Sequence, residues 1–428
     1  MVKLKRLKIN KYRNVRPGTE LRFDDGYNLV LGQNGSGKTT LLGLVALVMR
    51  NDFTSLRDEA FAFEYELVNE HHRLTVMIES AGRAELLDDA EIPFSSVVEF
   101  NYAVKCVDDT SKTLFTIEGS PKGTLVQRGT ESEELPAEHP FQAWFLLIHV
   151  AFEGELHNDL ARLHAGLVTR FDESLGSFHA LTGRESHAPG MAAPAMMRVV
   201  VAQAGLARVS TRLSKFAPIG IGQLFFATPG QPGGEIHIDL VAGSTHPPEL
   251  EFLSTAARSI GALATSCRPA SKNLDEQLRR GSVVLEIKGL AFTFKRANGM
   301  TLEHDLLSYG QKRLLSFFYY LATTRDVVIA DELVNGLHHR WIEACMEAIG
   351  DRQAFLTSQN PLLFDYIPEF ESVEQVQSRF ITCKTEIVDG AEQLVWQNMP
   401  ADHARVFYDA YKDDLEQVGE ILIARGLW

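Results

Sequence analysis

Residues Gly32–Thr39 read GQNGSGKT, which fills every position of the phosphate-loop pattern GxxxxGK[ST]. The apolar run YNLVL precedes this loop and has strand character, and the apolar stretch TLLGLVALVM follows it and suits a buried helix. A glycine-rich loop between a strand and a helix lets backbone N–H groups converge on phosphate oxygens, and the helix points its positive end at them. The sequence therefore predicts a nucleotide-phosphate site in an α/β fold.

The composition is that of a globular protein. The chain has 428 residues, of which 45% are hydrophobic and 23% charged, and this length is enough for two or three compact units. The longest apolar run near the middle, Ala143–Phe152, is much shorter than the roughly 20 residues that span a bilayer. The basic N-terminus has no apolar core behind it, so it does not read as a secretory signal. We expect a cytoplasmic location and no membrane partner.

Cysteine spacing and net charge argue against certain kinds of site and partner. The four cysteines are widely scattered and no CxxC occurs, which predicts buried thiols and argues against structural zinc or disulfides. The net charge of −14 argues against a surface that generally coats DNA. A local basic patch stays compatible with that charge, so a nucleic-acid partner is possible but not supported.

Changes in sequence character predict four segments. Residues 1–139 form an N-terminal lobe, in which several antiparallel strands between Phe61 and Gln127 follow the phosphate loop. Residues 140–271 form a helical insertion, in which Phe141–Leu181 and Glu249–Ser266 have helical spacing. Residues 272–400 form a second α/β lobe and 401–428 a C-terminal helix. That helix carries one apolar stripe, made of Phe407, Tyr411, Leu415, Val418 and Leu422. Packing on its own domain is the first interpretation of the stripe, and docking on a partner is the second.

The segment DVVIADE, residues 326–332, is a short apolar strand that ends in two carboxylates. Such a strand carries Asp331 to the carboxyl edge of the sheet, where ligands of open α/β folds bind. Asp331 can hold Mg²⁺ there together with Thr39, and Glu332 is suited to polarise a water molecule. Two acids after a strand can also simply cap the next turn, but the phosphate loop and the segment below make this alternative weaker.

The segment LLSYGQKRLL, residues 306–315, places Ser308 and Gly310 at a predicted helix N-terminus. The positive end of that helix can face a phosphate. Ser308 with Gln311 three residues later is also a capping-box pattern. Both interpretations can hold together, since a capped helix start is what the phosphate contact requires.

The order GQNGSGKT, LLSYGQKR, DVVIADE and DELVNGLHHRW resembles the ABC-type ATPase head of the SMC/RecF/OLD-like superfamily, in particular its compact AAA-labelled members. The resemblance implies an α/β ABC-type P-loop fold with an antiparallel β subdomain, ATP and Mg²⁺ as cofactors, and ATP hydrolysis. It also implies a homodimer or higher assembly in which ATP lies between the phosphate loop of one chain and SYGQ of another.

Site roles follow from the resemblance residue by residue. Lys38 and Glu332 become catalytic candidates, Glu332 as the base, and Thr39 with Asp331 the metal ligands. The expected cofactor-binding residues are Gly32, Asn34, Gly35, Ser36, Gly37, Lys38, Thr39, Thr40, Ser308, Gly310 and Gln311.

This sequence also departs from the family pattern. Gln359, in FLTSQNP, occupies the position of the family's switch histidine, and Tyr309 replaces the first glycine of the LSGGQ signature. Glutamine can position water or sense a phosphate by hydrogen bonding, but it does not titrate near neutral pH. Gln359 is therefore a third catalytic candidate, and slow hydrolysis is a reasonable hypothesis. The Q-loop glutamine stays open between Gln127 and Gln142, and Arg13 is either near the nucleotide or on the surface.

The expected function is that of an ATP-binding, ATP-hydrolysing head that controls a separately encoded effector in bacterial antiphage defence. One alternative is a RecF/SMC-like ATPase of DNA repair or chromosome maintenance. Another is a scaffold that uses ATP for assembly with little turnover. A transporter ATPase fits less well, because the large insertion and the NGLH segment are foreign to that group.

Overall fold

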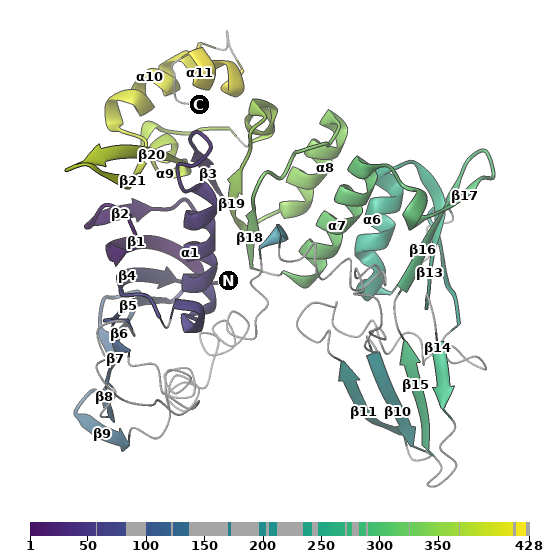
Figure 1. The fold of residues 1–428 in the computed structure, drawn as a ribbon, viewed down its shortest axis with the longest axis horizontal. Helices are drawn as coiled ribbons and strands as arrows, with labels where there is room; N and C mark the ends of the chain where they lie inside the picture. Colours follow the sequence, from purple (N-terminus) through teal and green to yellow (C-terminus); the bar gives the residue numbers. More distant parts are fainter. Residues whose placement is uncertain are drawn as a thin grey trace. The chain divides into compact units, whose positions relative to one another are not determined.

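The computed structural model of the chain (Figure 1) forms two compact units. The first contains Met1–Val168, Asp326–Leu333 and Asp351–Trp428, and the second contains Thr169–Arg325 and Val334–Gly350. The residues that the structure describes are 1–56, 58–82, 100–120, 123–136, 170–172, 197–202, 205–211, 234–241, 247–269, 272–275, 282–287, 290–324, 326–367, 369–413 and 417–424.

A five-stranded sheet organises the first unit, with the order β18-β19-β3-β20-β21. Its strands are β3 (Tyr27–Leu31), β18 (Val327–Ala330), β19 (Gln353–Thr357), β20 (Phe380–Val388) and β21 (Ala391–Asn398). The first four are parallel, and β21 runs antiparallel to β20. Every residue of β3, β18 and β19 is buried, as expected for parallel strands covered on both faces. The motif residues follow the carboxyl ends of these three strands, so they collect at one edge of the sheet.

Helix α1 (Lys38–Arg50) begins directly after the phosphate loop and is apolar almost all round. Its buried residues belong to one core cluster with residues of β1, β4, β18, β19 and β20. Such a helix must be covered on every side. This core therefore fixes the helix, and with it the loop at its N-terminus.

An eight-stranded antiparallel sheet lies in the N-terminal lobe, with the order β2-β1-β4-β5-β6-β7-β8-β9. In β4, buried residues alternate with partly exposed ones, which is the pattern of a strand with one face on the core. The antiparallel strands predicted between Phe61 and Gln127 are present, and β1 and β2 join them. The strands are β1 (Lys3–Tyr12), β2 (Thr19–Arg22), β4 (Phe61–Val68), β5 (His72–Ser80), β6 (Asn101–Asp108), β7 (Thr113–Ser120), β8 (Gly123–Arg128) and β9 (Glu131–Pro136).

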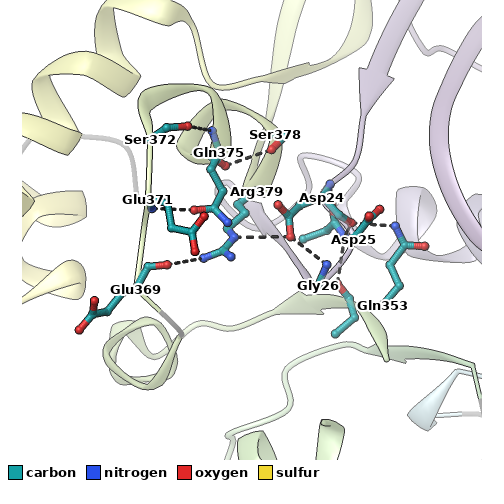
Figure 2. A network of polar contacts seen from close by, with 12 residues as sticks. Asp24, Asp25, Gly26, Gln353, Glu369, Glu371, Ser372, Gln375, Ser378 and Arg379 are labelled. Carbon is teal, nitrogen blue, oxygen red and sulfur yellow. Dashed lines mark hydrogen bonds and ion pairs between the residues drawn. The ribbon is translucent and has the colours of Figure 1, made fainter. Parts of the chain in front are cut away.

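A polar network anchors the amino end of β3, at the opposite end from the phosphate loop (Figure 2). The buried guanidinium of Arg379 pairs with Asp24 at 3.5 Å and donates to the carbonyl of Glu369 at 3.2 Å. Asp24 also accepts from the N–H of Gly26, and the Gln353 amide donates to the Asp24 carbonyl, both at 2.8 Å. These contacts join the turn before β3 to β19 and to α9 (Val373–Arg379), so the strand that leads into the phosphate loop is held at its start.

The described residues of the second unit form two four-stranded sheets and three α-helices. The sheet orders are β11-β10-β15-β14 and β12-β13-β16-β17. The strands are β10 (Met197–Ala202), β11 (Gly205–Thr211), β12 (Ile236–Asp239), β13 (Ala262–Pro269), β14 (Lys272–Asp275), β15 (Ser282–Ile287), β16 (Leu290–Arg296) and β17 (Thr301–Glu303). The helices are α6 (Glu251–Ser259), α7 (Tyr309–Thr323) and α8 (His339–Ile349). Phe252 of α6 packs edge-on against Tyr319 of α7, with ring centroids 5.4 Å apart.

The chain closes with two helices, α10 (Ala401–Lys412) and α11 (Val418–Ala424), and not with the single predicted helix. Phe407 and Leu422 of the predicted stripe are fully buried, and the Phe407 ring contacts those of Phe370 and Phe380. These two residues of the stripe therefore pack on their own unit, and Leu415 lies outside the described residues. No helix among the described residues is long and apolar enough to cross a membrane.

The described part of the range 140–271 differs from the predicted helical insertion outside α6. Besides α6 it holds β10, β11, β12 and β13, so the described part is largely strand. The helix predicted from Glu249 to Ser266 ends at Ser259, because Gly261 takes a left-handed backbone angle (φ +74°) and β13 begins one residue later. The predicted helical stretch Phe141–Leu181 lies outside the described residues apart from 170–172.

Candidate nucleotide site

Two glycines of the phosphate loop have no room for a side chain. A Cβ on Gly32 would lie 2.3 Å from the Cys383 carbonyl oxygen, and one on Gly37 would lie 2.8 Å from the Leu394 side chain. Gly35 and Gly37 also take positive φ angles of +85°, a region that glycine enters freely. The loop therefore needs its glycines both for its turns and for its close approach to the β20–β21 hairpin.

The polar groups of the loop fit a phosphate ligand. The Lys38 ammonium lies over the loop and donates to the carbonyls of Gly32 at 2.6 Å and Gln33 at 3.0 Å. The Ser36 hydroxyl is buried and has no hydrogen-bond partner among the described residues. A buried hydroxyl without a partner costs about 1–3 kcal/mol, and phosphate oxygens are acceptors that could satisfy it. Gly37 is the N-cap of α1, so the positive end of that helix also faces the loop.

Trp396 of β21 packs against the phosphate loop and supports it. It is almost fully buried, and its indole N–H donates to the Ser36 carbonyl at 3.3 Å. Its ring also fills the space next to Gly37, 3.2 Å from the position of a Cβ. Trp396 was not predicted from the sequence, because only strand pairing brings residue 396 to residue 36. The consecutive apolar residues Leu394, Val395 and Trp396 indicate a buried strand but not this contact.

Asp331 and Thr39, the predicted metal ligands, lie together in the first unit. The Thr39 hydroxyl donates to one carboxylate oxygen of Asp331, and the Thr357 hydroxyl donates to the other. No cluster of three or more His, Cys, Asp or Glu side chains that could hold a metal occurs in the described part of the chain. Mg²⁺ is usually bound by one or two carboxylates with water and nucleotide phosphates, so this donor pair fits a nucleotide-dependent Mg²⁺ site.

Glu332 and Gln359 are also in contact. The Gln359 side-chain amide donates to the Glu332 carboxylate and, at 3.4 Å, to the side-chain oxygen of Asn34 in the phosphate loop. Glu332 has a φ of +49°, a left-handed conformation that costs a non-glycine residue on the order of 1–3 kcal/mol. Strain of this kind concentrates at functional sites. Three segments far apart in sequence therefore share one hydrogen-bonded chain, Asn34–Gln359–Glu332.

The SYGQ segment belongs to the second unit, where it starts α7. Ser308 is the N-cap: its hydroxyl oxygen accepts from the Gln311 N–H at 3.4 Å, and the Gln311 side chain accepts from the Ser308 N–H at 3.0 Å. The capping box is thus formed. Since the Ser308 oxygen acts as an acceptor there, its O–H remains able to donate to another ligand.

Position 310 must be glycine, because it lies directly against the segment that follows Glu332. A Cβ on Gly310 would lie 2.5 Å from the Gly336 carbonyl oxygen and 2.9 Å from the Trp341 ring. The Tyr309 ring also lies against Gly336, where a Cβ would be 2.7 Å from it, although the Tyr309 side chain is 68% exposed. The NGLH turn and the start of α7 are therefore packed as one piece within the second unit.

Other candidates fall outside these two clusters. Arg13 forms a two-pronged ion pair with Glu59, both contacts at 2.7 Å, which agrees with the surface interpretation. Gln127 lies exposed on β8, and Gln142 lies outside the described residues. Also outside these clusters, the His338 and His339 ring centroids lie 3.9 Å apart with the rings tilted by 43°, next to the start of α8.

A hollow of about 990 Å³ lies on the eight-stranded sheet, lined by residues that include Glu64, Met77, Glu118 and Leu125. No residue of the phosphate loop lines it. The nucleotide site is therefore assigned from the glycine contacts and the side-chain hydrogen bonds, and not from the size of a hollow.

Two family models match separate parts of the chain. One, described as "AAA domain", matches residues 6–91, and the other, described as "AAA domain, putative AbiEii toxin, Type IV TA system", matches residues 235–365. The first range contains the phosphate loop, and the second contains SYGQ, Asp331, Glu332 and Gln359. No curated protein matches the chain.

Solved structures with a similar trace are heads of SMC proteins. The SMC head domain from Thermotoga maritima is 10% identical, with 92% of this chain and 98% of that chain covered, at a TM-score of 0.35. The Smc head domain with a coiled coil and joint from Pyrococcus yayanosii is 9% identical, with 96% and 100% covered, at a TM-score of 0.36. Similarities at these scores carry no argument here. The two AAA-domain matches and the mixed α/β fold with antiparallel sheets agree with the predicted P-loop ATPase head.

Proposed function

We propose that this chain binds and hydrolyses ATP with Mg²⁺ and that two copies close around the nucleotide. One observation carries the proposal: side chains of the phosphate loop, of the DVVIADE strand and of the strand before Gln359 are hydrogen-bonded to one another at a single sheet edge. Lys38 and Ser36 would bind phosphate oxygens, Thr39 and Asp331 would hold Mg²⁺, and Glu332 would orient and deprotonate water. Mg²⁺ would offset negative charge on the phosphates.

The second half of the site would come from a partner copy. Ser308, Gly310 and Gln311 start α7 with a free hydroxyl donor and a positive helix end, which suits a γ-phosphate held by another protomer. This reading explains why the start of α7 is capped and yet exposes Tyr309 and Leu306.

The dimer is tested with Glu332→Gln, which should bind ATP and hydrolyse it very slowly. We expect size-exclusion chromatography with light scattering to show twice the protomer mass with ATP and Mg²⁺, and the protomer mass without them. Lys38→Ala is the matched control and should stay at the protomer mass in both conditions. A Glu332→Gln protein that keeps the protomer mass at saturating ATP would refute the shared site.

Turnover is proposed to be slow, because Gln359 cannot accept a proton near neutral pH. Gln359→His should raise the steady-state rate of phosphate release, whereas Gln359→Leu should lower it. Equal rates for wild type and Gln359→His would contradict this part of the proposal. Tight ATP binding with no release of phosphate would instead support an assembly scaffold.

For the biological role, we propose control of a separately encoded effector in bacterial antiphage defence. The match to a family described by a putative AbiEii toxin and a type IV toxin–antitoxin system supports such a role. The test is co-expression with the products of adjacent genes, followed by co-purification and a phage plaque assay with wild type and Lys38→Ala. ATPase stimulation by DNA, with no co-purifying product, would favour a repair ATPase instead.

A further inference from the structure

Thr357, the last residue of β19, contacts both carboxylate-bearing residues that follow β18. Its hydroxyl donates to the Asp331 carboxylate and accepts the Glu332 backbone N–H at 2.9 Å. Its carbonyl accepts the Leu333 N–H at 3.4 Å. The side chain is fully buried, so water cannot substitute for these groups.

The donor and acceptor in each of these hydrogen bonds follow from the groups involved. A backbone N–H can only donate and an ionised carboxylate can only accept, so the residue between them must do both. A hydroxyl is the smallest side-chain group with one donor and two acceptor lone pairs. Valine has the shape of threonine and can do neither, whereas serine can do both.

The contact coincides with the strained residue of the site. Glu332 takes its left-handed backbone angle, φ +49°, between two N–H groups that Thr357 accepts. A non-glycine residue keeps such an angle only where its surroundings enforce it. The Leu333 bond goes to the Thr357 backbone and persists in any variant, whereas the Glu332 bond depends on the Thr357 hydroxyl. If the hydroxyl bond were lost, the turn would relax and the Glu332 carboxylate would leave its place beside Gln359.

We propose that Thr357 is the positioning residue of this site: its hydroxyl holds the Asp331 carboxylate and locks the Glu332 turn, so that metal ligand and base are placed by one side chain. The inference rests on the proposed ATPase function. Thr357 need not touch ATP, because it acts on the two residues that would.

The test compares Thr357→Val with Thr357→Ser in the full chain. Thr265→Val is the matched control, because Thr265 is a buried threonine of the second unit whose hydroxyl donates to the Thr293 carbonyl at 2.7 Å. We expect Thr357→Val to lower kcat about 10- to 100-fold, the effect of losing two hydrogen bonds, with a change of KM for ATP below about threefold. Thr357→Ser should stay within about threefold of wild type, and Thr265→Val should keep both constants.

Amide hydrogen exchange of residues 327–336, followed by mass spectrometry, measures how stable the Glu332 turn is. This measurement does not depend on ATP hydrolysis. Exchange should be faster in Thr357→Val than in wild type, and unchanged in Thr357→Ser and Thr265→Val. If Thr357→Val does not fold, Thr357→Cys replaces it, since a thiol is a weak donor of similar size.

The outcomes separate this inference from the proposed function. A wild-type protein without phosphate release refutes the ATPase, while the exchange comparison still decides whether Thr357 holds the turn. Unchanged exchange and a kcat within about twofold of wild type in Thr357→Val would overturn the inference. An equal loss of kcat in Thr357→Ser and Thr357→Val would overturn it too, because the hydroxyl group that serine keeps would then not be what positions the site.

Discussion

Replacing Trp396 by phenylalanine should weaken ATP binding through the backbone of the phosphate loop. Trp396 donates its indole N–H to the Ser36 carbonyl at 3.3 Å and is 2% exposed. Phenylalanine keeps most of the ring but has no donor, and it leaves a small void beside Gly37. A neutral hydrogen bond contributes a net of about 0.5–1.5 kcal/mol, which corresponds to roughly two- to thirteenfold in affinity if the bond holds the loop in its binding shape.

The assay is isothermal titration of ATP and Mg²⁺ into the Glu332→Gln background, where hydrolysis does not consume the ligand. Urea unfolding measures the accompanying loss of stability, which should be about 2–3 kcal/mol, because a buried carbonyl loses its partner and a small void opens. Tyr65→Phe is the matched control, since it removes the hydrogen bond from a fully buried hydroxyl to Asn51 in the same unit. That control should lose stability and keep its ATP affinity.

Two results would refute the reasoning about Trp396. An unchanged Kd in Trp396→Phe would mean that the hairpin does not shape the loop. An equally weakened Kd in Tyr65→Phe would mean that affinity follows global stability and not this contact.

Three further predictions concern other parts of the chain. Gly310→Ala should abolish the ATP-dependent dimer in the Glu332→Gln background and leave ATP binding by the single protomer intact, because a Cβ would lie 2.5 Å from the Gly336 carbonyl oxygen; chromatography and titration distinguish the two effects. Arg379→Met should lower the free energy of unfolding by about 3–5 kcal/mol in urea, because it leaves the carboxylate of Asp24 without its cation. Burial raises the pKa of the Cys383 thiol from 9.0 to about 12, so the native state holds this proton longer than the unfolded chain; stability should fall as pH rises from about 9, and urea midpoints at pH 8 and pH 10 in wild type and Cys383→Ala check the sign.

Local sequence patterns were enough to predict the part of the fold around the phosphate loop. The runs at Tyr27–Leu31 and Val327–Ala330 are short, apolar and bounded by polar or glycine residues, so they could be identified as buried strands from sequence. Parallel pairing then brings their carboxyl ends to one edge, which is why Asp331 could be expected beside Thr39. The geometry of a nucleotide site follows from strand order more than from any single side chain.

Contacts that depend on pairing between distant strands could not be predicted in this way. The residues next to Trp396 and Thr357 indicate buried strands but not these contacts, since each contact depends on the register of β21 or β19. The strand β13 was missed for a different reason: apolar spacing continues through Gly261, and only the left-handed angle at that glycine ends the helix. A glycine after the last helical turn was the signal that deserved more weight than periodicity.

The glutamine at position 359 makes an arrangement that a neutral histidine could not. Both of its recorded bonds leave from the same nitrogen, one to the Glu332 carboxylate and one to the Asn34 side-chain oxygen. An amide NH₂ has two donors, whereas a neutral imidazole has one N–H and must become charged to donate twice. Gln359 can therefore link the phosphate loop to the proposed base at any pH near neutrality. A movement of Asn34 would then be transmitted through Gln359 to Glu332. A histidine at this position would gain proton transfer and lose one end of that link, which is the physical basis for expecting faster turnover and a less tightly coupled switch in Gln359→His.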